Sequence, residues 1–356
     1  MNQFRSSFQY NGRINWFPGH MIKTRKLLKD TLKFIDVVIE IRDSRAPLST
    51  ENPILNELLM TNNNNRKSRV IVFNKSDLSN LQLQKRITDY FEDTAAQDKR
   101  KGAVAPMIAF TQSHANPSSS HPRHPLQLLK KAAEMHLKRY PPPTSYIQSP
   151  LQKEINMLVV GLPNVGKSSF INSIRSSSHK SKAAKVGALP GVTRNIRGFR
   201  ACDSPPAYLV DTPGIMIPGN LEDTEKALTL SLLGSISEKI VPLHVVADFL
   251  LYKLNQLNNT KYLTAFELDP KKPTDDINEL LNHICIKKKM LLTNNEPDLD
   301  QAAKYFITQY RDAKFGCFTL DTIPTIDKQL KNDNNNNNNN SNKNTSDGND
   351  SDNQIK

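Results

Sequence analysis

The chain has 356 residues, enough for more than one domain with a sizeable hydrophobic core. Hydrophobic residues make up 37% and charged residues 23%, as in soluble globular proteins, and no apolar run approaches the ~20 residues that cross a bilayer. The formal net charge of +13 is uncommon for a metabolic enzyme and usual for a protein that acts on a phosphate-rich polymer. A merely basic surface would give the same charge, so composition alone leaves both interpretations open.

The cysteines and the first residues bear on the compartment. Cys202, Cys285 and Cys317 lie far apart and are odd in number, which argues against a zinc site or a disulfide framework and favours a reducing compartment. No acidic residue precedes Asp30, while lysines and arginines recur. Residues 1–15 are therefore a candidate mitochondrial targeting segment.

Short apolar runs, typical of buried parallel strands, alternate with helical patterns over the first two thirds of the chain. We expect strands at Val37–Ile41, Val70–Phe73, Val104–Phe110, Asn156–Val160 and Tyr208–Val210. We expect helices at Thr24–Phe34, Asn52–Met60, Leu81–Phe91, Leu126–Tyr140 and Lys167–Ser176. This alternation predicts an α/β fold with a three-layer arrangement, in which helices cover both faces of a mostly parallel sheet.

The strand signal fades after about Asp223. Helical patterns follow at Glu225–Ile240, Leu243–Leu257, Asp275–Met290 and Asp298–Arg311. From Lys331 onward the chain is rich in asparagine, serine and aspartate, which bury too little apolar surface to offset chain entropy. We therefore expect an α/β domain over residues 16–223, a small all-α domain over 224–328 and a disordered tail over 329–356.

Gly161-Leu-Pro-Asn-Val-Gly-Lys-Ser168 matches the phosphate-loop pattern and lies between an expected strand and an expected helix. The backbone N–H groups of such a loop point at phosphate oxygens, and the positive end of the helix dipole adds to the attraction. Lys167 is expected to reach the β- and γ-phosphates, and Ser168 to bind Mg²⁺. The residues expected to contact nucleotide here are Asn164, Val165, Gly166, Lys167, Ser168 and Ser169.

Asp211-Thr-Pro-Gly214 ends an expected strand, where a magnesium-orienting aspartate belongs. Gly214 has no side chain and can bring its N–H close to the γ-phosphate. Between this motif and the phosphate loop lies Thr193, our candidate for the switch residue that completes Mg²⁺ coordination. Each motif alone also fits an ordinary turn or loop, so the assignment depends on their occurring together.

Asn74-Lys-Ser-Asp77 follows the expected strand Val70–Phe73. Asp77 can accept hydrogen bonds from N1–H and the exocyclic amine of guanine, a pair that adenine lacks, so guanine is the expected base. The stem of Lys75 is expected to lie along the base, and Asn74 to tie this loop to the phosphate loop. Together with Ser76, these residues form the expected guanine site. Phe110-Thr-Gln-Ser113 occupies the place of the loop whose backbone reads guanine O6.

The order of the motifs is unusual. In an ordinary GTPase the phosphate loop comes first and Asn-Lys-x-Asp last, whereas here Asn74–Asp77 precedes both the phosphate loop and Asp211–Gly214. Because the ends of a domain are often close in space, the chain can begin and end at another point of the same fold without moving the site. The sequence therefore predicts a circularly permuted P-loop GTPase. The segment after Gly214, which senses the γ-phosphate, runs directly into the helical domain, so nucleotide state is expected to move that domain.

The motifs resemble the YlqF/RbgA family of circularly permuted GTPases, and within it the mitochondrial branch. The resemblance is carried by Asn15-Trp-Phe-Pro-Gly-His-Met21, Asp43-Ser-Arg-Ala-Pro47, Asn74–Asp77, Gly161–Ser169 and Asp211–Gly214, and extends to about Leu320. It implies GTP hydrolysis that is stimulated by the pre-ribosome, maturation of the large ribosomal subunit, and a helical domain that contacts rRNA. It also implies a location in the mitochondrial matrix, with peripheral association at the inner membrane.

Two residues bear on the mechanism of hydrolysis. Many GTPases place a glutamine after Asp-x-x-Gly to orient the attacking water, but here that position is Ile215. The resemblance implies that His20 replaces it, although a histidine at this place also fits simple packing at a helix start. The resemblance further implies that Asn164 holds K⁺ between the phosphates, where the ion acts as an arginine finger does elsewhere.

RNA binding has candidate residues rather than a motif. They are Lys23, Arg25, Lys26 and Lys29 on the first helix and Lys287, Lys288 and Lys289 late in the chain. A solvated helix face would look the same. A nucleotide-gated RNA-binding scaffold with little hydrolysis therefore remains as an alternative, as does a GTPase that regulates translation.

Overall fold

The computed structural model describes residues 4–10, 12, 14, 21–61, 67–99, 105–113, 120–141, 154–178, 186–188, 197–210, 223–269 and 272–325. The chain divides into a compact unit over Met1–Thr322 and a second over Ile323–Lys356. The expected boundary at residues 223 and 224 lies within the first unit, and the division into an α/β and a helical domain stays a prediction. The tail over 329–356 lies outside the described residues.

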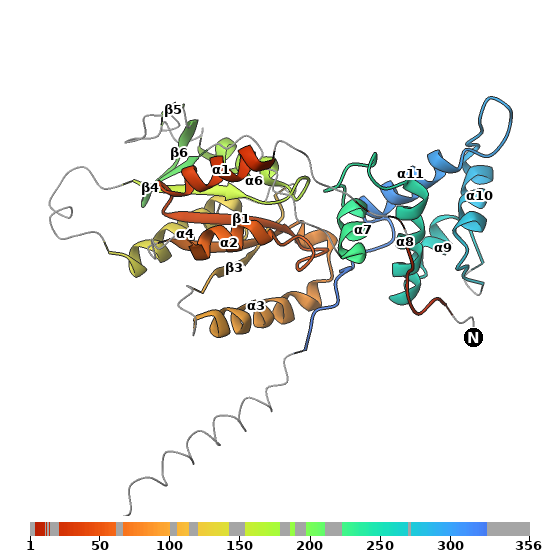
Figure 1. The fold of residues 1–356 in the computed structure, drawn as a ribbon, viewed down its shortest axis with the longest axis horizontal. Coiled ribbons are helices and arrows are strands. Elements are labelled where there is room, and N and C mark those ends of the chain that lie inside the picture. The colour runs from red at the N-terminus through yellow and green to blue at the C-terminus, as the bar shows by residue number, and fades with distance from the viewer. Residues whose placement is uncertain are drawn as a thin grey trace, which may run out of the picture. The chain divides into compact units, whose positions relative to one another are not determined.

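The described strands form one seven-stranded sheet in the order β3-β2-β1-β4-β7-β6-β5 (Figure 1). The strands from β3 to β7 in that order run parallel. β6 pairs antiparallel with β7, and β5 pairs antiparallel with β6. The bounds are β1 Val37–Asp43, β2 Ser68–Asn74, β3 Met107–Phe110, β4 Ile155–Val160, β5 Val186–Ala188, β6 Arg197–Asp203 and β7 Pro206–Val210. The expected mostly parallel sheet is confirmed.

Sequence reasoning missed β5 and β6. In β6 the buried Phe199 and Ala201 alternate with the partly exposed Arg200, so the strand shows no continuous apolar run. This alternation arises because β6 lies near the edge of the sheet and is covered on one face, whereas the central β1 is buried along its whole length.

Helices cover both faces of the sheet. The helices of this region are α1 Met21–Leu32, α2 Pro53–Thr61, α3 Gln84–Lys99, α4 Pro125–Arg139 and α6 Lys167–Ser178. Val37, Ile39 and Ile41 of β1 pack with side chains of α4 and α6, while Val38 belongs to a separate cluster with α1 and α2. Alternate residues of one strand therefore point into two apolar layers, and this gives the three-layer architecture.

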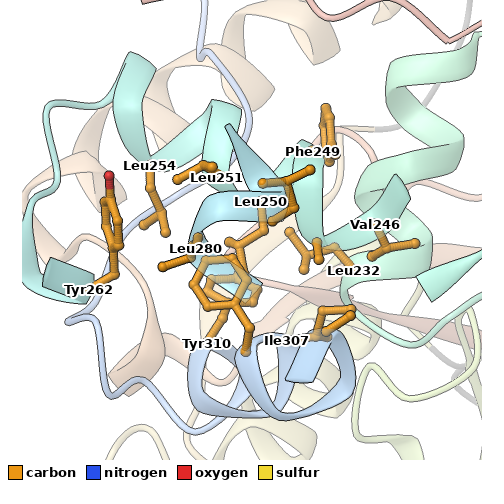
Figure 2. Close-up of a cluster of buried hydrophobic side chains, with 14 of the residues drawn as sticks. Leu232, Val246, Phe249, Leu250, Leu251, Leu254, Tyr262, Leu280, Ile307 and Tyr310 are labelled. Atoms are coloured by element: carbon orange, nitrogen blue, oxygen red, sulfur yellow. The ribbon is translucent and has the colours of Figure 1, made fainter. Parts of the chain in front are cut away.

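The remaining described helices are α7 Thr224–Leu232, α8 Leu243–Gln256, α9 Lys261–Ala265, α10 Ile277–Lys288 and α11 Leu299–Arg311, and we call residues 223–321 the helical region. They share a large apolar core, in which Figure 2 shows Leu250 of α8 near Ile307 and Tyr310 of α11. Ala46, from the loop after β1, joins this core, so it also includes a residue of the α/β region. Among the described residues, no helix is long and apolar enough to span a membrane.

The helix expected over Glu225–Ile240 is shorter than the sequence predicted. It ends at Leu232 because Gly234 adopts φ +75°, a left-handed conformation, and Ser235 N–H donates to Leu230 O at 2.8 Å. Glycine reaches this conformation without steric cost, and such a turn satisfies the last carbonyls of a helix. The resulting tight turn, residues 231–235, is important for the site described below.

The first described residues pack against the helical region. Arg5 forms ion pairs with Asp248 at 2.7 Å and Asp275 at 3.2 Å. Phe8 packs edge-on against Phe249, with ring centroids 5.3 Å apart. These contacts give residues 4–10 a structural role that the sequence did not predict, and their role in targeting stays a prediction.

A buried ion network joins the first two strands. The carboxylate of Glu40 on β1 binds Arg42 on the same strand and Arg69 on β2, and Arg42 also reaches Glu51 at 3.0 Å. Glu40 and Arg42 are fully buried. Burial alone would raise the pKa of Glu40, but the two arginines lower this pKa to about 2. Glu40 is therefore the ionised centre of the network.

We predict that Glu40→Ala lowers the free energy of unfolding by about 3–5 kcal/mol, because Arg42 would keep a buried charge without its main partner. Glu57→Ala is the matched control, since Glu57 pairs with Arg25 and both side chains are 51% exposed. The control is expected to cost less than about 1 kcal/mol. Urea unfolding followed by circular dichroism measures both, and equal losses would contradict the assignment.

Candidate nucleotide-binding site

The phosphate loop lies between β4 and α6, as expected, and its backbone depends on two glycines. Gly161 adopts φ +152°, and a Cβ there would lie 2.4 Å from the carbonyl oxygen of Ile41. Gly166 adopts φ +99°, and a Cβ there would lie 2.0 Å from the side-chain nitrogen of Asn74. Glycine is required at both positions because any side chain would be strained and would collide with a neighbour.

Lys167 is the first residue of α6, and its ammonium has a hydrogen-bond partner in the structure, a backbone carbonyl oxygen. Its Nζ donates to Leu162 O at 2.6 Å, and burial lowers the pKa of Lys167 to about 8. The fit to a nucleotide is good, because a phosphate would supply the negative charge that this buried ammonium needs. Ser168 and Ser169 follow in the first turn of α6, where backbone N–H groups and the helix dipole favour an anion.

Asn74 ends β2 and ties three loops together. Its Nδ2 donates to Val165 O of the phosphate loop at 2.9 Å, and its Oδ1 accepts from Ser113 N at 3.1 Å. Both bonds are buried. The predicted link between the guanine motif and the phosphate loop is thereby confirmed.

Lys75 adopts a left-handed backbone at φ +57° and sends its side chain to the phosphate loop. Its Nζ donates to Asn164 O at 2.6 Å and pairs with Asp43 at 3.0 Å. Asp77 lies in the short 3-10 helix η1 Ser76–Leu78 that follows. The expected roles of Lys75 and Asp77 toward the base stay predictions, and the structure adds the pairing of Lys75 with Asp43.

Asp43 is the residue of this site that sequence reasoning did not assign to it. The carboxylate is buried between Lys75 and Arg45, whose Nη2 lies 2.9 Å away. Although burial opposes ionisation, Arg45 and Lys75 hold the pKa of Asp43 well below its usual range. The position of Asp43 could have indicated its place in the site, because Asp43 ends β1 and pairs in register with Asn74 of β2. Carboxyl ends of neighbouring parallel strands meet at one sheet edge, where ligands bind.

The loop after β3 lies beside the guanine motif. Thr111 N donates to Phe73 O at 2.9 Å, and Ser76 N donates to Thr111 O at 3.1 Å. The segment Phe110–Ser113 thus packs against Asn74–Asp77, which is the neighbourhood that the sequence predicted for it.

Several expected site residues lie outside the described part of the chain: His20, Thr193, Asp211 and Gly214. Their roles stay predictions. β7, which ends one residue before Asp211, pairs in parallel with β4, which leads into the phosphate loop. Among the described residues, no group of three His, Cys, Asp or Glu side chains could hold a metal ion. Of the expected Mg²⁺ ligands Ser168, Thr193 and Asp211, only Ser168 belongs to the described residues.

The buried ammonium of Lys167 predicts how affinity depends on pH. A bound phosphate favours the charged form, so binding above pH 8 requires uptake of a proton by Lys167. GDP affinity is therefore expected to fall as pH rises, by about fourfold between pH 6.5 and 8.5. Calorimetry at several pH values, in buffers of different ionisation enthalpy, measures both the affinity and the proton uptake. A flat profile without proton uptake would contradict the role of Lys167.

Comparison with known proteins agrees with this geometry. Residues 156–296 match the family model described as 50S ribosome-binding GTPase. Mitochondrial GTPase 1 of Schizosaccharomyces pombe is 33% identical over 90% of this chain and 93% of its own length. Mitochondrial ribosome-associated GTPase 1 of Xenopus tropicalis is 33% identical, over 89% of this chain and 98% of its own.

A solved structure supports the fold. The crystal structure of GNP-bound YlqF from T. maritima aligns with a TM-score of 0.52 and 19% identity, over 85% of this chain and all of that one. At this identity the likeness concerns the fold alone. The extent and identity of the sequence matches show that the chain belongs to the family of GTPases that includes mitochondrial GTPase 1 and mitochondrial ribosome-associated GTPase 1.

Proposed function

We propose that this GTPase is an assembly factor for the large subunit of the mitochondrial ribosome and hydrolyses GTP when it is bound to the immature particle. The observation that carries the proposal is that Asn74 and Lys75 donate hydrogen bonds to the phosphate loop, which brings the expected guanine and phosphate motifs together. Relatives named as mitochondrial and ribosome-associated support the location and the partner. The net charge of +13 suits a partner rich in rRNA.

Guanine recognition in this proposal uses Asp77 and one backbone amide. The carboxylate of Asp77 accepts from the base, and Ser76 sets the turn that presents it. In the loop after β3, Thr111 N and Ser113 N are already bonded to Phe73 O and Asn74 Oδ1. We therefore assign Gln112 N–H, which lies between them, as the donor to guanine O6.

Mg²⁺ is the cofactor that P-loop GTPases use, and it neutralises charge on the β- and γ-phosphates. In this chain Ser168, Thr193 and Asp211 would hold it, with Gly214 beside the γ-phosphate. Lys167 and the backbone N–H groups of residues 164–169 would bind the phosphates.

His20 is proposed to orient the attacking water, because Ile215 stands where many GTPases carry glutamine. The helical region and the lysines at 287–289 are proposed to contact rRNA. Lys287 pairs with Glu267, whereas the side chains of Lys288 and Lys289 remain exposed. The mitochondrial matrix is the proposed location, with peripheral association at the inner membrane.

The hydrolase proposal predicts that immature large subunits accelerate GTP turnover and that His20→Ala abolishes most of the acceleration. A water-positioning group contributes about 10²–10⁴-fold. His244→Ala is the control, because His244 is an exposed histidine on α8 that belongs to none of the motifs. Turnover is measured by phosphate release with and without the particles, and particle association by sedimentation. Undiminished stimulation in His20→Ala, together with normal subunit maturation, would favour the nucleotide-gated RNA-binding scaffold instead.

K⁺ is proposed to act beside the phosphates through Asn164. The side-chain nitrogen of Asn164 donates to Gly234 O at 2.6 Å, which leaves an amide oxygen, a ligand type that K⁺ accepts. A cation there would supply positive charge near the transferred phosphoryl group.

Replacement of K⁺ by Na⁺ is therefore expected to slow wild-type turnover by about tenfold or more, and to change little in Asn164→Ala. Phosphate release at constant ionic strength measures this. Equal wild-type rates in the two salts would show that Asn164 does not hold an activating K⁺.

A further inference from the structure

The turn after α7 lies against the phosphate loop. Asn164 Nδ2 donates to Gly234 O at 2.6 Å, and Ser235 Oγ donates to Pro163 O at 2.7 Å. Two consecutive residues of the phosphate loop are thus held from the helical region. The turn is tight, because Gly234 has φ +75° and a Cβ there would lie 3.4 Å from side-chain nitrogens of both Asn164 and Arg311. Even small displacement of residues 231–235 would therefore loosen the phosphate loop.

Arg311, the last residue of α11, holds the turn in place. Its Nε donates to Leu232 O at 2.9 Å and its Nη2 to Ser231 O at 3.1 Å. Its Nη1 pairs with Glu238 at 3.2 Å. The planar guanidinium can bind two carbonyl groups and a carboxylate at once, which a lysine ammonium cannot do with the same geometry.

The same end of α11 also reaches the guanine motif. Arg45 Nη1 donates to Arg311 O at 3.3 Å, and the Arg45 guanidinium lies 5.6 Å from the centre of the Tyr310 ring. Arg45 pairs with Asp43, Asp43 pairs with Lys75, and Lys75 donates to Asn164 O. The contacts therefore form a closed circuit that begins and ends at the phosphate loop.

The segment after α11 attaches to the loop after β1 and also contacts the guanine loop. Leu320 N donates to Arg45 O at 2.7 Å, and the carboxylate of Asp321 accepts from the backbone N–H groups of Leu48 and Ser49. Cys317 Sγ lies 3.1 Å from the carbonyl oxygen of Asp77. The helical region thus touches both loops that are expected to hold the nucleotide.

We propose that Arg311 is a positioning residue for the nucleotide pocket, and that the docked end of α11 sets the affinity for guanine nucleotide. A partner that draws α11 away from the turn would release the phosphate loop and accelerate nucleotide dissociation. By linkage, bound nucleotide would weaken binding of that partner to the same degree. This route runs through contacts that the structure describes, whereas residues 211–222, which include the switch segment after Gly214, lie outside the described residues. It rests on the proposed nucleotide site.

The test compares the dissociation rate of fluorescent mant-GDP from the wild type, four full-length variants and a control. We expect Ser235→Ala to release GDP about threefold faster and Arg311→Ala about tenfold faster, from the loss of one and of several hydrogen bonds. Arg311 acts through the turn, so the double variant is expected to release GDP at the same rate as Arg311→Ala. Independent effects would instead multiply and give an acceleration of about thirtyfold. Arg311→Lys is expected to resemble Arg311→Ala, since a lysine ammonium cannot make the same set of hydrogen bonds as the planar guanidinium.

Lys304→Ala is the matched control, because it removes a cation from the exposed face of the same helix and is expected to leave the rate unchanged. Thermal midpoints at saturating GDP check that the variants fold. If Arg311→Ala fails to fold, Ser235→Ala carries the test alone, since it removes one hydroxyl. Wild-type release rates in Ser235→Ala, or multiplying effects in the double variant, would overturn the inference. Wild-type protein without GDP affinity would instead overturn the nucleotide site itself.

Discussion

The nucleotide site depends on a buried carboxylate, that of Asp43, which lies between two cations at the end of the central strand. Burial of such a charge is expensive unless it is paired, and Arg45 and Lys75 both lie within 3.0 Å of it. Lys75 belongs to the guanine motif, and Arg45 packs against the end of α11. The charge that orders the guanine loop therefore also orders the contact with the helical region. Neither cation could be lost without leaving this carboxylate short of a partner.

The sheet topology explains how a permuted chain keeps one site. β1, β2 and β3, which come first in the sequence, lie on one side of β4, and β7 lies on its other side. All five strands are parallel, so their carboxyl ends lie at the same edge. The order in which the chain visits the strands does not alter this edge. Asn74 and Val165 thus meet although they are 91 residues apart.

The helical region contacts the α/β region at several places. Ala46 lies in its core, and residues 4–10 at the other end of the α/β segment pack on α8. The phosphate loop touches it at Gly234 and Ser235. A GTPase needs one element that responds to both nucleotide and partner, and energetic coupling needs contacts that differ between two states. The hydrogen bonds of Arg311 are suited to this, because backbone carbonyls can exchange them for water.

The sequence by itself determined the elements and the chemistry of the motifs. The five parallel strands were predicted because fully buried strands are continuous apolar runs, and the phosphate loop and guanine motif because their residue types have specific binding roles. Strand β6, which lies next to the edge strand β5, was missed because its polar residues alternate with buried ones. The end of α7 was misplaced because only the turn at Gly234 decides it.

Only the tertiary structure decided which residues support the motifs. Ser235 and Arg311 are ordinary polar residues in the sequence, and the motif Asp43-Ser-Arg-Ala-Pro47 does not by itself reveal that Asp43 and Arg45 support the nucleotide site. Ser235, Arg311 and Arg45 take their role from hydrogen bonds to residues that lie 72 to 266 positions away in the chain. Packing of the sheet and the helical core brings these residues together. Local patterns report which backbone conformation a segment prefers and which ligand a motif can bind. The partner of a side chain is set instead by the fold, because it depends on which elements the apolar cores bring together.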